Sequence, residues 1–261
     1  MSGFDLNGCC ALITGASAGI GREFACQLAG RAGALVLVAR RLDRLQELRD
    51  ELTKKDPNLN VHCRAVDLSQ PSEVQELCGW LEREGIAVDC LINNAGLGDR
   101  GPFATGEPPR LHEMIAVNVA ALTLLTRALL PAMLEKKRGA ILNVSSSAGF
   151  LPIRKMAVYA ASKSYVTSFS ESLRGEVRKQ GIIVSALCPG PVDTEFSSVA
   201  RRSIGKQPYP SPSIMHMPVE AVVRAGLAGI KRNKPLVIPG IVMKIAMLLV
   251  RLTPMAILRR I

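Results

Sequence analysis

Short apolar runs alternate with longer amphipathic segments along most of the chain. We predict that the apolar runs are β-strands, because each is short and bounded by turn residues or by a helical pattern. They cover residues 9–15, 34–39, 60–68, 88–94, 139–145, 182–190 and 235–240. The segments between them repeat their apolar residues at helical spacing, as Leu45, Leu48 and Leu52 do. These predicted helices cover residues 20–32, 42–52, 71–83, 109–134 and 157–179.

Strands that are apolar throughout, each followed by a helix, indicate a parallel sheet covered on both faces. The repeated strand–helix order predicts a single-domain doubly wound α/β Rossmann fold, with a seven-stranded parallel sheet and right-handed crossovers. No linker or internal repeat interrupts this order, so we expect one domain over residues 1–240. The proline-rich stretch 201–217 lacks periodicity and is expected to be a mobile excursion on the substrate side, and 241–261 a tail without a domain of its own.

Composition narrows the class of protein. Of the 261 residues, 48% are hydrophobic and 21% charged, which favours a globular core over disorder. Aromatic residues make up only 4%, too few for the stacking platforms that bind single-stranded nucleic acid. Seven scattered cysteines without a CxxC pair are typical of a reduced, cytoplasmic protein, and the N-terminus lacks a signal pattern. Three dispersed histidines predict no metal site.

The positive charge is concentrated at the end of the chain. The chain has 33 basic and 22 acidic residues. Residues 201–261 hold 11 of the basic residues and 1 of the acidic ones, so +10 of the net charge of +11 lies there. The apolar, basic segment 241–261 predicts an amphipathic helix on an anionic membrane surface, and it is too interrupted to span one. A lid over the substrate site, a dimer contact and an ordinary packed helix remain open. Nucleic-acid binding is not expected, since no recognition motif accompanies the charge.

The first predicted strand runs directly into "TGASAGIG", residues 14–21. Glycines at 15, 19 and 21 allow a tight turn and a close backbone approach to a ligand at the start of the next helix. Free amides and the helix dipole favour a pyrophosphate at such a position. The strand–loop–helix context makes a turn that serves packing alone the weaker interpretation.

The glycine spacing resembles the "TGxxxGxG" fingerprint of the short-chain dehydrogenase/reductase superfamily. The resemblance continues through "NNAG" at 93–96, Asn118, "SSSAG" at 145–149, "YAASK" at 159–163 and "PGPVDT" at 189–194, and it spans about residues 8–240. It implies an NADP(H)- or NAD(H)-dependent oxidoreductase that works as a homodimer or homotetramer. It also implies contacts with the cofactor from Gly15, Ser17, Gly19, Ile20, Gly21, Asp67, Asn94, Ala95, Gly96, Pro189, Gly190, Val192 and Thr194.

Arg40 directly follows the second predicted strand, at a position where an acidic residue would bind the ribose 2′-hydroxyl of NAD. A guanidinium matches the geometry of a 2′-phosphate instead, and Ser17 offers a hydroxyl nearby. We therefore predict NADP(H) as the cofactor. The alternative is that Arg40, Arg41 and Arg44 form a solvated helix start, but cations at a helix N-terminus oppose its dipole.

Tyr159 and Lys163 stand four residues apart, on one face of a predicted helix. An ammonium beside a phenol is expected to lower the phenol's pKa, so that it can exchange a proton with a substrate oxygen. Strand alternation puts Ser146 on the opposite face from Ser145 and Ser147 and leaves the choice between them open. The resemblance selects Ser146, assigns Lys163 to the nicotinamide ribose, and gives Asn118 a water-mediated contact with Lys163 in a proton relay.

The expected substrate walls are apolar, at residues 97–98, 150–153 and 214–217. They favour a small hydrophobic carbonyl or alcohol substrate over a sugar. The chain looks like the branch containing 3-oxoacyl reductases, so lipid metabolism and a 3-oxoacyl thioester are specific expectations. Two hypotheses follow: a carbonyl reductase with Tyr159 as acid/base, or a non-catalytic NADP-binding module that docks on a membrane through its tail.

Overall fold

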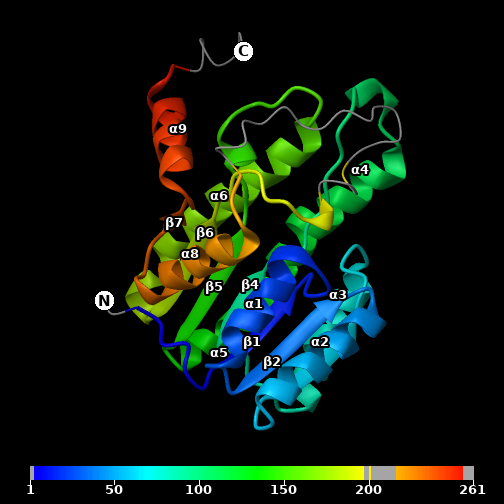
Figure 1. The fold of residues 1–261 in the computed structure, drawn as a ribbon, viewed down its shortest axis with the longest axis vertical. Helices are drawn as coiled ribbons and strands as arrows, with labels where there is room; N and C mark the ends of the chain where they lie inside the picture. Colours follow the sequence, from blue (N-terminus) through cyan, green and yellow to red (C-terminus); the bar gives the residue numbers. More distant parts are fainter. Residues whose placement is uncertain (1–2, 197–199, 201–215, 255–261) are drawn as a thin grey trace.

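A single parallel sheet forms the centre of the protein (Figure 1). The computed structural model describes residues 3–196, 200 and 216–254, so most of the predicted excursion and residues 255–261 lie outside the described part. The sheet has seven strands in the order β3-β2-β1-β4-β5-β6-β7, all paired in parallel. The strands are β1 (Cys10–Thr14), β2 (Ala34–Ala39), β3 (Asn60–Ala65), β4 (Cys90–Asn93), β5 (Gly139–Val144), β6 (Ile182–Leu187) and β7 (Leu236–Val237).

Helices cover both faces of the sheet, which confirms the predicted doubly wound fold. One face is covered by α1 (Gly19–Ala29), α2 (Leu42–Lys55) and α8 (Val219–Lys231). The other face is covered by α3 (Pro71–Arg83), α5 (Leu122–Glu135) and α6 (Ala157–Val177). Other helices among the described residues are α4 (Pro108–Ile115), α9 (Ile241–Leu252), the π-helical segment Ala116–Ala121 and the short 3₁₀ helices at Phe103–Thr105, Ser147–Phe150 and Arg178–Gln180.

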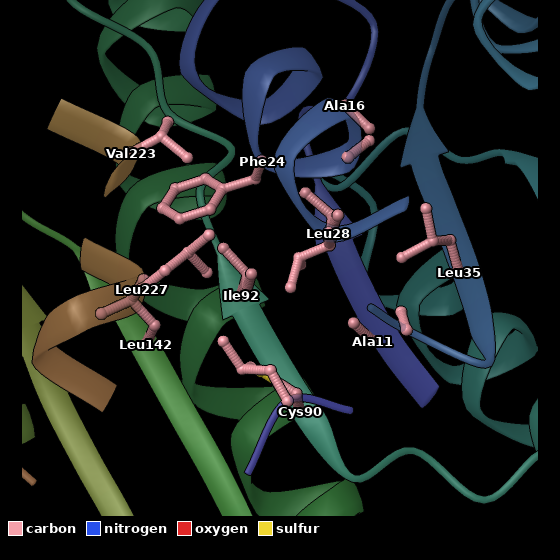
Figure 2. Close-up of a cluster of buried hydrophobic side chains, with 14 of the residues drawn as sticks. Ala11, Ala16, Phe24, Leu28, Leu35, Cys90, Ile92, Leu142, Val223 and Leu227 are labelled. Atoms are coloured by element: carbon pink, nitrogen blue, oxygen red, sulfur yellow. The ribbon is translucent and has the colours of Figure 1, made fainter. Parts of the chain in front are cut away.

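The core follows the two-residue period of the strands. On β1, Leu12 packs into the cluster under α3 and α5, and its neighbour Ile13 packs into the cluster under α1 and α8. Figure 2 shows part of the cluster under α1 and α8, to which Phe24 and Leu28 of α1 and Leu227 of α8 belong. All of these side chains are buried. Both faces of each central strand are therefore anchored, which fixes the ends of β1, β4 and β5 relative to one another.

Strand order reverses between β1 and β4. The chain runs from β1 outward to β2 and β3, then returns across the sheet to β4 on the other side of β1. At such a switch point the loops after two neighbouring strands separate and leave a crevice at their carboxyl ends, where ligands bind in sheets of this kind. The glycine loop follows β1 and "NNAG" covers the end of β4.

Three elements differ from the sequence analysis. Helix α8 fills a stretch where no helix was predicted, and β7 is only two residues long. The helix predicted over 109–134 extends from Pro108 to Glu135 and contains a π-helical turn at Ala116–Ala121, which was not predicted. This helix is long and apolar enough to cross a membrane by length and composition alone. Its inner residues Val117 and Leu125 belong to the core, so we assign it to the fold.

Candidate active site

The loop between β1 and α1 can be formed only with glycine at two of its positions. Gly15 has φ +66°, and a Cβ there would lie 3.0 Å from the Asn94 Nδ2 and the Ala95 Cα. A Cβ on Gly21 would lie 2.2 Å from the Gly15 carbonyl oxygen. The helix N-terminus is thereby drawn tightly against its own loop. Ala18, the residue that caps α1, has no side chain able to bind the first-turn amides.

The "NNAG" segment is tied to this loop by hydrogen bonds. Asn94 Nδ2 donates to the Thr14 carbonyl oxygen at 2.9 Å, and the backbone amides of Asn94 and Ala95 both donate to Thr14 Oγ1 at 2.9 Å. Asn94 thus serves as a structural link as well as a predicted cofactor contact. The ends of β1 and β4 are held together at the switch point, where the predicted ligand would lie.

A cavity of about 540 Å³ runs from the glycine loop to the predicted catalytic residues. Four predicted residues do not line it: Gly21 supports the loop from behind, Asn118 lies behind Leu97, and Arg40 and Asp67 lie elsewhere. All the other predicted site residues do: Gly15, Ser17, Gly19, Ile20, Asn94, Ala95, Gly96, Ser146, Tyr159, Lys163, Pro189, Gly190, Val192 and Thr194. The sequence motifs, spread over 180 positions of chain, therefore meet in one cavity.

The cationic residues around the loop differ from the prediction. Arg40 turns away and pairs with Glu113 at 2.8 Å. Its neighbour Arg41 lies beside the loop instead, with Nη2 at 3.2 Å from Ser17 Oγ. Arg41 and Arg44 also pair with Glu195, at 3.2 and 2.7 Å, and Arg44 lines a groove of about 720 Å³ that continues outward from Ser17 and Gly19. The 2′-phosphate contact predicted for Arg40 thus has a better-placed candidate in Arg41.

Asp67, predicted to contact the cofactor, lies just after β3 and is half-buried. Its carboxylate accepts a hydrogen bond from the Ser69 amide at 2.9 Å, and its own amide donates to Glu73 at 2.6 Å. These bonds shape the turn into α3. A cofactor contact for Asp67 stays a prediction.

Tyr159 is buried and lines the cavity beside Ser146, whose hydroxyl is close enough to lower the phenol pKa. Ser146 caps the 3₁₀ helix after β5, where its hydroxyl also accepts from the Ala148 amide at 3.1 Å. Ser145 turns the other way, donating to the Lys163 carbonyl at 2.8 Å and lying 2.8 Å from Thr167 Oγ1. Between these two serines the structure brings Ser146 to the phenol.

Lys163 is buried and lines the cavity. Its Nζ donates to the Val144 carbonyl oxygen at 2.9 Å and lies 5.8 Å from the centre of the Tyr159 ring. A Cβ on Gly96 would lie 3.3 Å from this Nζ, so glycine at 96 leaves room for the ammonium. Helical spacing thus does bring the phenol and the ammonium to one site.

Burial dominates the acidity of both groups. It raises the pKa of Tyr159 to about 12, although the hydrogen bond from Ser146 lowers it in part. It lowers the pKa of Lys163 to about 8, because an ammonium loses its hydration there. The expected lowering of the phenol pKa by Lys163 is therefore wrong for this structure: removal from water outweighs the neighbouring cation. At neutral pH the phenol keeps its proton.

Asn118 lies in the π-helical turn and is buried. Its Oδ1 accepts from the Leu97 amide at 2.7 Å, while its Nδ2 donates to the Leu97 carbonyl at 2.9 Å and to Ser162 Oγ at 3.0 Å. Asn118 therefore fixes the backbone of Leu97, the residue that follows "NNAG" and lines the cavity. The water-mediated relay to Lys163 stays a prediction.

The side of the cavity next to Tyr159 is apolar. The ring of Phe196 lies 5.6 Å from that of Tyr159, and Ile153 and Met156 join the same cluster. Leu97, Gly98 and Ile153 were predicted walls and are confirmed as lining residues, whereas Phe150 and Met217 do not line the cavity. Ile214 and Met215 lie outside the described residues. Phe196 and Met156 also line the cavity and were not predicted. Phe196 lies two residues after "PGPVDT", and Met156 immediately precedes α6.

Cysteines and metal-binding groups add nothing to this site. All seven cysteines are free, and each is buried or half-buried. Over residues 3–196, 200 and 216–254, no group of three His, Cys, Asp or Glu side chains could hold a metal ion.

A family model described as short chain dehydrogenase matches residues 9–204. The match covers most of the chain and contains the glycine loop, "NNAG", "YAASK" and "PGPVDT". The chain belongs to the short chain dehydrogenase family. Members of this family that match the chain include proteins named as reductases and dehydrogenases.

Individual members of the short chain dehydrogenase family resemble it closely. A very-long-chain 3-oxoacyl-CoA reductase from Rattus norvegicus is 33% identical over 200 residues, which are 75% of this chain and 63% of the rat protein, so the chain spans less than two thirds of that relative. A short-chain dehydrogenase from Sphingobium yanoikuyae in complex with NADPH has a TM-score of 0.79 and 33% identity, covering 89% of this chain and 88% of that one. A family member from Burkholderia phymatum in complex with NAD has a TM-score of 0.80 and 26% identity, covering 94% of each chain.

The geometry of the glycine loop fits the dinucleotide that this family uses. A Cβ-free cradle at Gly15 and Gly21, an α1 N-terminus without a capping side chain, and the Ser17 hydroxyl form a donor set for a pyrophosphate. The cavity then leads to the phenol of Tyr159 at its inner side. Residues present in the structure thus fit an NAD(P) cofactor.

Proposed function

We propose that this enzyme is an NADP(H)-dependent carbonyl reductase, with Tyr159 as the acid/base. One observation carries the proposal: the buried phenol of Tyr159 lines, together with Ser146 and Lys163, the same cavity that begins at the glycine loop. A bound nicotinamide nucleotide supplies the hydride for reduction of a carbonyl, or accepts it in the reverse reaction. The protein has to supply the proton and hold the reactants.

The chain offers a distinct group for each part of the cofactor. Amides of the glycine loop suit the pyrophosphate, and the buried ammonium of Lys163 suits a ribose hydroxyl. Arg41 and Ser17, 3.2 Å apart, suit a 2′-phosphate, which favours NADP(H) over NAD(H). The NADPH bound by the Sphingobium protein supports the same choice.

The acidity of the site favours reduction. A phenol with a pKa of about 12 holds a proton that it can donate to a carbonyl oxygen as negative charge develops there. Ser146 lines the cavity beside that phenol and is placed to hold the same oxygen. Lys163, with its pKa lowered to about 8, is a nearby source of a replacement proton.

The substrate is proposed to be a hydrophobic carbonyl compound. Leu97, Ile153, Met156 and Phe196 give the cavity an apolar wall beside Tyr159, and they offer few partners for the hydroxyls of a sugar. A 3-oxoacyl thioester is the specific candidate, and the name of the rat relative supports it. Such a substrate has an apolar chain next to the carbonyl that would be reduced.

The test is a substrate screen with NADPH and NADH side by side. Turnover is measured as the loss of absorbance of the reduced cofactor. The panel contains 3-oxoacyl thioesters of increasing chain length, bulky apolar ketones and keto sugars. We expect turnover with NADPH that rises with the apolar area of the carbonyl compound. Preference for keto sugars or for NADH would contradict the proposal. NADPH binding without turnover of any carbonyl would instead favour the non-catalytic, membrane-docking module.

A further inference from the structure

Helix α9 is apolar on two opposite faces. Met243 and Met247 are buried against the body of the protein, at 5% and 6% exposure. The opposite face is exposed to solvent and consists of large aliphatic side chains, each between 54% and 72% exposed: Ile241, Ile245, Leu248, Leu249 and Leu252. A surface helix normally turns polar residues outward. Half of the exposed large hydrophobic residues of the described chain therefore gather on one short helix, which marks an interaction surface.

The charges on α9 are arranged beside this apolar face. Lys244 and Arg251 are exposed and seven residues apart, so they lie on the same flank of the helix. No acidic residue follows Glu220 in the sequence, and Arg259 and Arg260 lie beyond the described part. A flank of cations beside an apolar face is the arrangement of helices that lie in the plane of an anionic membrane surface.

The position of α9 leaves its outer face accessible. Figure 1 shows the helix standing out from the body beside the end of β7, near the C-terminus of the described chain. Its inner side packs on the 3₁₀ helix Ser147–Phe150, and the Arg251 guanidinium lies 5.9 Å from the centre of the Phe150 ring. The helix is thus anchored at the segment that follows Ser146, with its apolar face turned away.

We propose that α9 docks the protein on an anionic lipid surface. Its five exposed aliphatic side chains enter the boundary between headgroups and acyl chains, while Lys244 and Arg251 meet lipid phosphates. A second copy of the chain is the weaker occupant. A twofold interface through this face would bring Lys244 and Arg251 close to their copies, and α9 carries no acidic residue to pair with them. The inference is independent of the chemistry at Tyr159.

Vesicle co-sedimentation tests the proposal on the full chain. The probes are vesicles of phosphatidylcholine alone and of phosphatidylcholine with phosphatidylserine, at low and high salt. We expect binding to the anionic vesicles that weakens with salt. Leu248→Ser and Leu252→Ser should each weaken it about tenfold through lost apolar burial. Lys244→Gln should weaken it about fivefold.

Matched variants separate this surface from general effects. Leu42→Ser removes an exposed leucine on α2, and Lys54→Gln removes an exposed cation on the same helix. Both should bind vesicles like the wild type. Absence of wild-type binding to anionic vesicles, or equal loss in these controls, would overturn the proposal. So would a lipid-free dimer, seen by light scattering, that Leu248→Ser dissociates, because a second copy would then cover the face.

Discussion

Replacing Lys163 with methionine should stabilise the fold while it removes activity. Lys163 is 4% exposed, and its ammonium has one hydrogen bond among the described contacts, to the Val144 carbonyl. Lowering its pKa from 10.5 to about 8 corresponds to a cost of about 3 kcal/mol for burying the charge at neutral pH. Methionine has no charge to desolvate, but it leaves the carbonyl without that donor, which costs about 1–2 kcal/mol. A net gain of about 1–2 kcal/mol is expected near neutrality.

The pH dependence of this difference identifies its cause. Below about pH 8 Lys163 is protonated in both the folded and the unfolded states, so the full cost is present. Between about pH 8 and 10.5 the unfolded state holds a proton that the folded state has lost, so wild-type stability rises with pH. Tyr159 titrates in both proteins, and its contribution cancels in the comparison. The advantage of the variant should therefore shrink by about 2–3 kcal/mol from about pH 7 to about pH 10.

Urea unfolding of wild type and Lys163→Met at both pH values measures this difference. Lys54→Met serves as the control, because Lys54 is exposed and its replacement should give no comparable change with pH. Activity of Lys163→Met with the preferred carbonyl compound should be lost. A difference in unfolding free energy that is the same at both pH values would refute the reasoning, since the burial of the ammonium would then carry no cost.

Two further substitutions test the glycine loop and the cofactor preference. Gly21→Ala places a Cβ 2.2 Å from the Gly15 carbonyl and should lower the melting temperature and abolish NADPH binding; Gly175→Ala, with nothing within 4 Å, should stabilise α6 by about 1 kcal/mol. Arg41→Ser should raise the KM for NADPH at least tenfold, because it removes a charge-assisted hydrogen bond to the 2′-phosphate. The KM for NADH should stay almost unchanged. Arg40→Ser, which removes only the pair with Glu113, should change neither KM, and the reverse pattern would restore the original prediction.

The features that depend on the local pattern of residues could be predicted from the sequence. Strands, most helices and the sheet architecture follow from short apolar runs and helical periodicity, and the glycine loop follows from its context between β1 and α1. The spacing of Tyr159 and Lys163 also predicted that they share a site. The π-helical turn around Asn118 leaves no such trace, because one widened turn hardly disturbs the apolar repeat of a long helix.

What depends on distant contacts was not predicted. Arg40 and Arg41 are neighbours in sequence, and only the position of Glu113, on a helix 73 residues away from Arg40, shows which one turns from the loop. The acidity of Tyr159 was judged from the cation one helical turn away. Burial under Phe196 and the rest of the apolar wall decides it, and burial is a property of the tertiary structure.

The most direct test of the account is the turnover number of Tyr159→Phe. This variant keeps the ring that packs on Phe196 and loses only the hydroxyl that donates the proton. With the preferred apolar carbonyl compound, kcat should fall by about 10²–10⁴-fold while NADPH binding, measured separately by fluorescence titration, stays unchanged. A kcat equal to that of the wild type, with NADPH bound equally well, would contradict the role of this phenol as the proton donor.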